Sequence, residues 1–459
     1  MNASNAAERP NVVFVFADQW RAQATGYAGN PDVQTPNLDR LTAESVNCTH
    51  AVSGTPVCSP YRASFMTGQF PLTHGVFVND VCLQHRSPSI ADAFRAGGYD
   101  TAYIGKWHLD GHGRSAYIPP ERRQGFHYWK VLECTHNYNK SAYYEDNDPT
   151  QRVWDGYDAF AQTRDAQRCI RNRNGERPFF LVLSWGPPHA PYKTAPEAFR
   201  ALYDPLALTL RPNVPESSDQ EARDCLAGYY AHCSALDQCV GDLLRTLDDE
   251  KLTDNTIFVF TSDHGDMLGS HGLTKKQKPW DESIRVPFLI RWPLGLGRKG
   301  RENPAFIDAP DLMPTLLGLC GLPIPDSVQG VDLSDCLAGG EDPGDGAVLL
   351  ACHQPFGQWR RGGDGPPEMT GREYRGLRTR RYTYARDLQG PWLLYDNRED
   401  PCQLNNRIHD PDMAEIRRQL DNWLQKKLNA SGDDFRPGLD YIREWDYPVD
   451  ETGTVPYQN

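Results

Sequence analysis

Four separate runs of continuous apolar residues constrain the fold of this 459-residue chain more than any other feature. They are short, rich in Val, Ile, Leu and Phe, and cover residues 11–17, 101–105, 178–185 and 256–262. Such runs are typical of strands that are buried on both faces of a parallel sheet. Helical patterns accompany them over residues 36–45, 90–98, 219–248 and 308–319. We therefore predict an α/β fold with a large, mostly parallel sheet flanked by helices.

The pattern changes after residues 337–346, a segment rich in glycine and acidic residues that is typical of a linker. Beyond it, short runs alternate between polar and apolar positions, at residues 374–379, 382–385 and 392–396, and a helical pattern follows over 413–428. This order predicts a smaller C-terminal α+β domain built on an antiparallel sheet. We place the catalytic α/β domain at residues 1–345 and the smaller domain at 346–459. Residues 110–175 are polar and poorly periodic, and we predict long loops around a pocket there.

Each apolar run of the first domain ends in polar side chains. These are Asp18 and Gln19, Lys106 and His108, His189, and Asp263 and His264. Taken singly, each has an ordinary alternative role as a helix cap or as a hydrogen-bonded histidine of the core. Polar groups at the carboxyl ends of parallel strands meet at one edge of the sheet, however, and that edge is where open α/β sheets bind ligands. The four strand ends together predict a single site.

The segment Cys58-Ser59-Pro60-Tyr61-Arg62 adds a candidate nucleophile to this set. Pro60 is tolerated in a first helical turn, so Cys58 is expected at a helix N-terminus. Backbone N–H groups there, together with Arg62, favour negative charge on a nucleophile or an oxyanion. The alternative is a buried cysteine in a turn, since free cysteines are commonly buried.

Residues 58–62 resemble the C-x-P-x-R signature of the type I, formylglycine-dependent sulfatases of the alkaline phosphatase superfamily, and residues 68–76 also resemble that family. The C-x5-R loop of thiol phosphatases fits less well, because Arg62 follows Cys58 too early. The resemblance covers most of residues 10–405. It implies that a formylglycine-generating enzyme oxidises Cys58 to formylglycine, whose hydrated aldehyde is the nucleophile.

The resemblance also implies one divalent metal ion. Its predicted ligands are Asp18, Gln19, Cys58 in its modified form, Asp263 and His264. Mostly oxygen ligands suit a hard cation, so calcium is favoured, with magnesium and manganese left open. Gln19 stands where the family usually has a second aspartate, and His264 stands where many members have asparagine.

The remaining catalytic positions are cationic. Arg62, Lys106 and Lys276 are suited to neutralising the charge of a transferring sulfate group. Lys275 or Lys278 could take the place of Lys276, because the three lysines lie close together in the sequence.

The family mechanism gives the histidines separate proton-transfer roles. One hydroxyl of the modified Cys58 attacks sulfur, while His189 and Lys276 assist the departing alcohol. His108 then takes the proton of the other hydroxyl, which expels sulfate and restores the aldehyde.

A sulfated carbohydrate is the expected substrate, as a small molecule or an oligosaccharide. Weaker candidates for its contacts are Asn79, Arg114, Arg122, Arg123 and Trp280. A net charge of −13 disfavours nucleic acids and anionic membranes as partners, and no apolar run approaches a membrane span. The polar N-terminus predicts a cytoplasmic protein, or an exported one whose leader is absent from this sequence. The sequence does not specify the oligomeric state.

Two alternative functions remain. The nearer one is a phosphonate or phosphate diester hydrolase of the same superfamily, which the Asp18-Gln19 and Asp263-His264 pairs also resemble. Lys106 and His108 argue for a sulfatase instead. The other alternative is a binding protein in which Cys58 stays an unmodified thiol.

Overall fold

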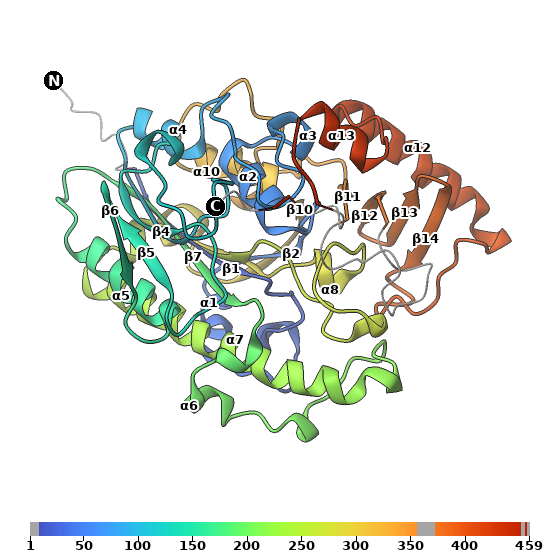
Figure 1. Ribbon diagram of the computed structural model, residues 1–459, viewed down its shortest axis with the longest axis horizontal. Helices are drawn as coiled ribbons and strands as arrows, with labels where there is room; N and C mark the ends of the chain where they lie inside the picture. Colours follow the sequence, from blue (N-terminus) through green and yellow to red (C-terminus); the bar gives the residue numbers. More distant parts are fainter. Residues whose placement is uncertain (1–8, 356–371, 451–454, 457–459) are drawn as a thin grey trace.

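A computed structural model describes residues 9–355, 372–450 and 455–456, and these contain a ten-stranded and a four-stranded sheet (Figure 1). The strand order of the large sheet is β10-β2-β9-β8-β1-β7-β3-β4-β5-β6. Its strands are β1 (Asn11–Asp18), β2 (Val46–Ala51), β3 (Asp100–Lys106), β4 (Tyr128–Leu132), β5 (Ala142–Glu145), β6 (Asp148–Val153), β7 (Phe179–Pro188), β8 (Thr256–Ser262), β9 (Phe288–Arg291) and β10 (Arg301–Ile307). The four central strands, β8, β1, β7 and β3, run parallel and correspond to the four apolar runs. The predicted fold class is confirmed.

Helices cover both faces of this sheet. They are α1 (Pro36–Thr42), α2 (Cys58–Thr67), α3 (Pro71–His74), α4 (Ile90–Ala96), α5 (Asp158–Arg171), α6 (Glu197–Arg200), α7 (Asp219–Asp249), α8 (Asp281–Ile284), α9 (Pro293–Leu296), α10 (Ala309–Leu319) and α11 (Ser334–Leu337). Figure 1 shows α7 on one side of the sheet and α2 and α10 on the other. None of the described helices is long and apolar enough to cross a membrane.

Strand β1 shows why the central strands read as unbroken apolar runs. Val12, Phe14 and Phe16 point into the apolar layer shared with α2 and α10. Val13 and Val15 point into the layer shared with α7. All five side chains are fully buried, because a strand covered on both faces has no position for a solvent-exposed residue.

The expectation of loops over residues 110–175 is wrong in part, because β4, β5, β6 and α5 lie within this range. Strand β6 is an exposed edge strand, so its side chains are polar and carry no alternating signal. The buried face of α5 combines alanines, such as Ala159 and Ala166, with polar residues, such as Asp158, Gln162 and Asp165. Small and polar side chains give a weak apolar pattern, which explains why the sequence did not reveal this helix.

The four-stranded sheet consists of antiparallel strands in the order β11 (Ala347–Cys352), β12 (Tyr374–Thr379), β13 (Tyr382–Asp387) and β14 (Gly390–Asp396). Two further helices, α12 (Ala414–Ser431) and α13 (Gly438–Glu444), follow it. One face of the sheet packs against Leu420 and Leu424 of α12. The other face packs against Met267, Trp280 and Ile284, which belong to the segment that follows β8. A domain boundary at residue 345 stays a prediction.

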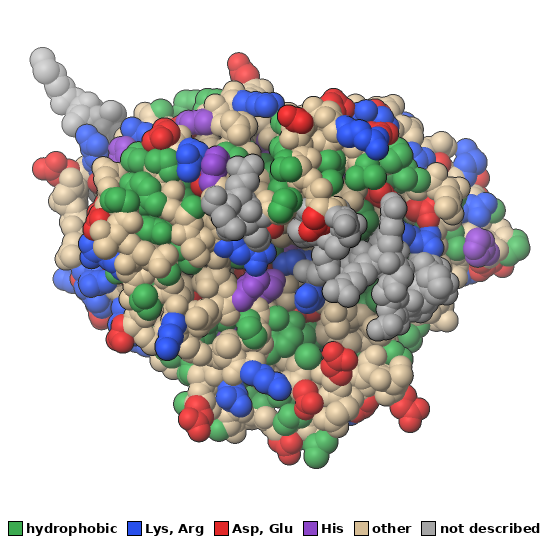
Figure 2. Space-filling model, viewed as in Figure 1, with side chains coloured by type: hydrophobic (Ala, Val, Ile, Leu, Met, Phe, Trp, Pro, Cys, Tyr) green, Lys and Arg blue, Asp and Glu red, His purple; other side chains and the backbone are tan. Residues whose placement is uncertain are grey.

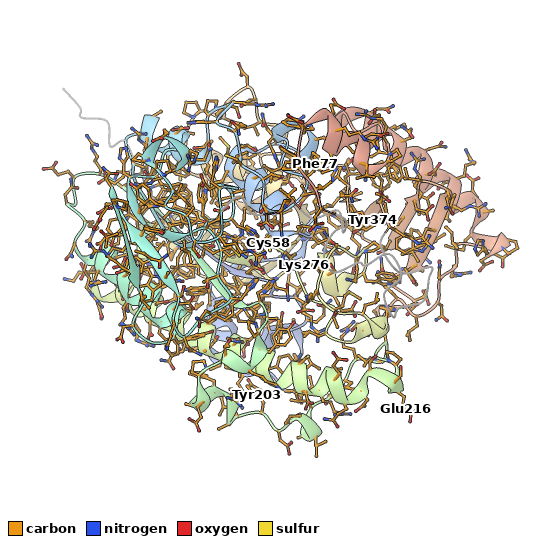
Figure 3. The ribbon with its side chains drawn as sticks, viewed as in Figure 1. Cys58, Phe77, Tyr203, Glu216, Lys276 and Tyr374 are labelled. Atoms are coloured by element: carbon orange, nitrogen blue, oxygen red, sulfur yellow. The ribbon has the colours of Figure 1, made fainter. Side chains whose placement is uncertain are left out.

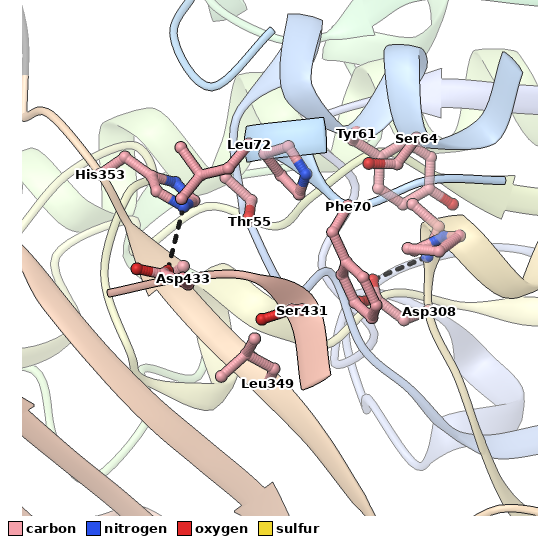
Figure 4. Close-up of a pocket in the computed structure, with 14 residues that line it drawn as sticks. Thr55, Tyr61, Ser64, Phe70, Leu72, Asp308, Leu349, His353, Ser431 and Asp433 are labelled. Atoms are coloured by element: carbon pink, nitrogen blue, oxygen red, sulfur yellow. Dashed lines mark hydrogen bonds and ion pairs between the residues drawn. The ribbon is translucent and has the colours of Figure 1, made fainter. Parts of the chain in front are cut away.

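A small cavity lies where segments of the two sheets meet (Figure 4). Tyr61 and Ser64 of α2 line it from one side, and His353 and Asp433 line it from the other. His353 Nε2 lies 3.5 Å from a carboxylate oxygen of Asp433. None of the predicted site residues lines this cavity, so we assign it to packing between the two sheets.

Candidate active site

The polar ends of the four central strands meet, as predicted from the apolar runs. Lys106 Nζ, at the end of β3, lies 2.6 Å from Asp18 Oδ2, at the end of β1. The backbone N–H of Gln19 donates to Asp263 Oδ1, just beyond β8, over 3.0 Å. Gly105 allows this convergence: its φ is +107°, and a Cβ there would lie 2.0 Å from the carbonyl oxygen of Ser184 on β7. Only glycine lets the two strands approach so closely at this point.

Cys58 is the first residue of α2 and faces the same edge. Its Sγ lies 2.9 Å from Lys276 Nζ and 3.3 Å from His264 Nε2. Asp18 Oδ1 lies 3.5 Å away on another side. Asn79 Oδ1 accepts from the Ser59 N–H over 2.9 Å and thereby holds the first turn of the helix. Cys58 is only 1% exposed, so its sulfur lies inside the protein. Figure 3 labels Cys58 and Lys276 side by side near the centre of the molecule.

Arg62 joins the two carboxylates beneath Cys58. One guanidinium nitrogen lies 3.2 Å from Asp18 Oδ2 and 3.1 Å from Asp263 Oδ2. The other donates to Ser184 Oγ over 2.7 Å and to the Lys106 carbonyl oxygen over 2.9 Å. All of these side chains are buried, so their charges interact with little screening by water.

This arrangement of charges shifts two titrations in the same direction. Burial alone would raise the pKa of Asp18, but Lys106 and Lys276 outweigh it and bring the pKa well below its usual range. Burial and Asp18 would raise the pKa of the Cys58 thiol, but the same two lysines and His264 outweigh them and lower it well below its usual value. The site therefore stabilises negative charge at the position of the Cys58 sulfur.

The predicted metal ligands also come together. Ligand atoms of Asp18, Cys58, Asp263 and His264 all lie within 4.8 Å of one another. Gln19 Oε1 is buried and accepts no hydrogen bond from the described residues. Gln19 also adopts a φ of +75°, a strained conformation for a residue other than glycine. A buried oxygen without a donor, beside two carboxylates, fits a hard divalent cation.

His108 approaches Cys58 from the loop after β3. Its Nε2 lies 2.7 Å from Asp80 Oδ1, whereas its Nδ1 is buried and has no hydrogen-bond partner among the described residues. Burial would lower the pKa of His108, but Cys134 and the hydrogen bond to Asp80 raise it to about 10. Both His108 and Asp80 have positive φ, at +59° and +69°. Strained backbone of this kind is common at functional sites.

Among the three neighbouring lysines, the structure brings only Lys276 into contact with Cys58. Lys278 Nζ is buried and donates to the carbonyl oxygens of Thr274 and Lys276. The backbone N–H of Lys275 donates to Asp266 Oδ1, and its side chain lines a separate pocket. The geometry therefore favours Lys276 as the residue that contacts sulfate.

The five weaker candidates lie at different distances from this centre. Asn79 holds the first turn of α2, and Arg114 is 41% exposed with one guanidinium nitrogen 3.9 Å from Asp80. Arg122 is bound to Asp110. The structure places the other two within the protein interior: Arg123 donates to backbone carbonyl groups, and Trp280 donates to the Tyr395 hydroxyl.

Sequence reasoning missed three residues that support the site. Asp80 binds His108, Ser184 binds Arg62, and Asp266 Oδ2 accepts from Gln19 Nε2 over 2.6 Å. Each had a signal: Asp80 follows the candidate Asn79, Ser184 is a polar residue near the end of an apolar run, and Asp266 belongs to the polar group after 256–262.

Basic side chains lie on the surface near the site. Figure 2 shows Lys, Arg and His side chains gathered near the centre of the visible face, where Figure 3 labels Cys58 and Lys276. This local positive cluster contrasts with the chain as a whole, which carries a net charge of −13. It would attract an anionic group of a substrate.

Comparisons with known proteins agree with this geometry. Residues 10–322 match the Sulfatase family, and residues 269–430 match the family described as N-sulphoglucosamine sulphohydrolase, C-terminal. The chain is 45% identical to an ulvan-active sulfatase of Formosa agariphila, over 98% of this chain and 87% of that protein. It is 32% identical to an endo-4-O-sulfatase of Bacteroides thetaiotaomicron, over 92% and 94% of the two chains. The solved structure of yidJ from Bacteroides fragilis has a TM-score of 0.83 at 31% identity and covers 96% of this chain and 99% of its own. The chain therefore belongs to the sulfatase family of the alkaline phosphatase superfamily, whose members hydrolyse sulfate esters.

Proposed function

We propose that this sulfatase releases sulfate from a sulfated carbohydrate, using a formylglycine made from Cys58 and one divalent cation. The observation that carries the proposal is the position of the Cys58 sulfur, 2.9 Å from Lys276 Nζ and 3.5 Å from Asp18 Oδ1. An oxygen of the modified residue would replace this sulfur and would lie next to the same ammonium group of Lys276 and the same carboxylate of Asp18. A formylglycine-generating enzyme is the partner that this modification requires.

Asp18, Gln19, Asp263 and His264 would hold the cation, with the modified Cys58 as a fifth ligand. Calcium suits a donor set of mainly oxygens. When bound, such a cation would neutralise charge on sulfate oxygens.

The basic side chains of the site would have two different roles. Arg62 is occupied by Asp18 and Asp263, so its role is to hold both carboxylates in place. Lys106 and Lys276 face the position of Cys58 and can stabilise the charge that develops on the sulfate oxygens in the transition state.

The two histidines occupy different environments that suit separate proton transfers. In its neutral form, His108 can accept a proton from the nucleophile's hydroxyl at Nδ1, which has no hydrogen-bond partner among the described residues, and Asp80 on its other nitrogen increases its affinity for that proton. Burial and Lys276 lower the pKa of His189 well below its usual value, so this residue gives up a proton readily. The negative charge of a bound sulfate ester would raise that pKa again. His189 would then carry the proton that the leaving oxygen needs.

A carbohydrate substrate is supported by the two relatives above, which are named for ulvan and for an endo-acting 4-O-sulfatase activity. Arg114, partly exposed beside Asp80, would contact the sugar rather than the sulfate. The sulfate group would provide most of the binding energy, and the surrounding loops would select the sugar.

The test combines mass spectrometry with a substrate panel. Protein produced together with a formylglycine-generating enzyme is expected to carry the aldehyde at position 58. It should release sulfate from sulfated mono- or oligosaccharides with a higher kcat/KM than from a simple aryl sulfate. Fully active protein with an unmodified Cys58 thiol would contradict the proposal. Faster turnover of phosphonate esters than of any sulfate ester would favour the superfamily alternative.

A further inference from the structure

A second histidine, His136, lies flat against His189. It belongs to the loop between β4 and β5, and its ring centroid is 4.7 Å from that of His189. The two ring planes differ by only 2°. His136 is partly exposed, whereas His189 is buried, so one ring covers the face of the other on the way to solvent. Parallel rings at this separation pack favourably and limit each other's rotation.

The loop that carries His136 is attached to the loop that carries His189. The hydroxyl of the fully buried Tyr138 lies 3.3 Å from the Gly186 carbonyl oxygen and 3.4 Å from that of Ala190. Asn139 Nδ2 donates to the Thr194 carbonyl oxygen over 3.1 Å. These contacts fix the spacing of the two loops, so the stacked arrangement follows from the fold.

Cys134 holds His136 from another direction. Burial would raise the pKa of the Cys134 thiol, but Lys106, His108 and a hydrogen bond with His136 bring it to about 6. The same hydrogen bond links the ring of His136 to the buried Cys134 while that ring packs on His189.

His189 itself has one nitrogen committed to the backbone. Its Nδ1 lies 2.8 Å from the Ala190 carbonyl oxygen. A carbonyl oxygen can only accept, so Nδ1 carries a proton and Nε2 remains for the reacting group. We propose that His136 is a positioning residue, whose ring fixes the plane of His189 so that Nε2 serves the leaving-group oxygen. This inference rests on the proposed function, in which His189 protonates the departing alcohol.

Esters with different leaving groups can separate such a role from general support of the fold. A nitrophenolate departs without a proton, whereas an alcohol of a sugar or an alkyl chain needs one in the transition state. A misdirected His189 should therefore slow poor leaving groups much more than good ones. A general loss of folded protein would slow all esters equally.

The experiment compares His136→Ala, His136→Phe and wild type, all with modified Cys58, on aryl sulfates of graded leaving-group acidity and on an alkyl sulfate. His136→Ala is expected to lower kcat for the alkyl ester by about 10- to 100-fold and for 4-nitrophenyl sulfate by less than about 3-fold, with KM nearly unchanged. His136→Phe keeps a flat ring and should recover much of the loss. His409→Ala, at an exposed position, is the matched control and should behave as wild type.

An equal loss across the series, or no loss at all, would overturn the positioning role. A crystal structure of the alanine variant gives a second readout, in which His189 should leave the Ala190 carbonyl group. An unchanged His189 there would also count against the inference. Failure of modified wild-type protein to release sulfate from any ester would instead overturn the proposed function, and it would be seen before any variant is assayed.

Discussion

Two buried aspartates, Asp18 and Asp281, belong to different kinds of polar cluster: Asp18 lies in the proposed active site, and Asp281 lies in an ion pair between the two sheets. Both oxygens of Asp281 are bound by the Arg378 guanidinium, over 2.7 and 2.9 Å, which ties α8 to β12. Only one oxygen of Asp18 is bound in this way, by Lys106 and Arg62. Its other oxygen faces Cys58, 3.5 Å away.

The two carboxylates differ in whether the polar atoms around them all have hydrogen-bond or ionic partners. Asp281 and Arg378 form a closed pair between the two sheets, in which both carboxylate oxygens are bound, and Arg285 lies 3.6 Å from the same carboxylate. Asp18 belongs to an open cluster, which includes Gln19 Oε1 and His108 Nδ1 as buried atoms with no partner among the described residues. Open polar clusters in a protein interior cost stability and persist where a ligand or a reaction completes them.

Replacing Cys58 should give the largest difference between the effect on activity and the effect on stability. Cys58→Ala removes the nucleophile, so kcat is expected to fall on the order of 10⁵-fold, as in other enzymes that lose a covalent nucleophile. The midpoint of urea unfolding should change little, because the two sheets stay tied through Asp281. Sulfate release and equilibrium unfolding on the same preparation measure both. Residual turnover close to wild type would contradict the role of Cys58.

Removing a metal ligand should have the next largest effect. Asp263→Asn keeps the shape of the side chain but takes one negative charge from the open cluster. We expect a loss of bound divalent cation, seen by elemental analysis, together with a loss of activity of about 100-fold or more. Asp281→Asn should keep its full metal content, which makes it the matched control. A full metal content in the Asp263 variant would contradict the ligand assignment.

Breaking the closed pair should instead affect unfolding. Asp281→Asn leaves Arg378 buried without its counter-ion, and the free energy of unfolding should fall by about 3 to 5 kcal/mol. Activity per folded molecule should remain near wild type. Glu415→Gln removes an exposed partner of Arg418 and should leave the unfolding midpoint unchanged. If Asp281→Asn and Glu415→Gln lowered the free energy of unfolding by similar amounts, burial would not explain the importance of the Asp281–Arg378 pair.

The pH dependence of stability gives the smallest and most specific effect. Burial would raise the pKa of Asp281, but Arg378 outweighs it and lowers the pKa from 3.8 to about 2. A lowered carboxyl pKa stabilises the folded state above the unfolded-state value and loses that contribution as the pH falls. The stability gap between wild type and Asp281→Asn should therefore be constant above pH 3.8 and shrink between that pH and about 2. Urea titrations across this range measure the gap, and a gap that instead widened on acidification would refute the pairing.

The sequence predicted the parts of this molecule that depend on strong local patterns. Strands β1, β3, β7 and β8 are covered on both faces and therefore appear as apolar runs. Their polar ends could be assigned to one site because parallel strands end at a common edge. Asp80 could not be predicted in the same way, since its contact with His108 depends on the path of two irregular loops. Strand β6 and helix α5 escaped prediction because an edge position and small or polar side chains weaken the pattern.

The burial of helix α2 has a consequence for how the protein matures. All ten residues from Cys58 to Thr67 are buried, and Cys58 is 1% exposed. An enzyme that oxidises Cys58 needs the surrounding segment in its own active site, which the folded protein does not permit. If Cys58 is modified as proposed, oxidation would therefore have to come before folding, and the two processes would compete for each newly made chain. A molecule that folded first would then keep its thiol and stay inactive, so the yield of active enzyme would depend on timing during synthesis as much as on sequence.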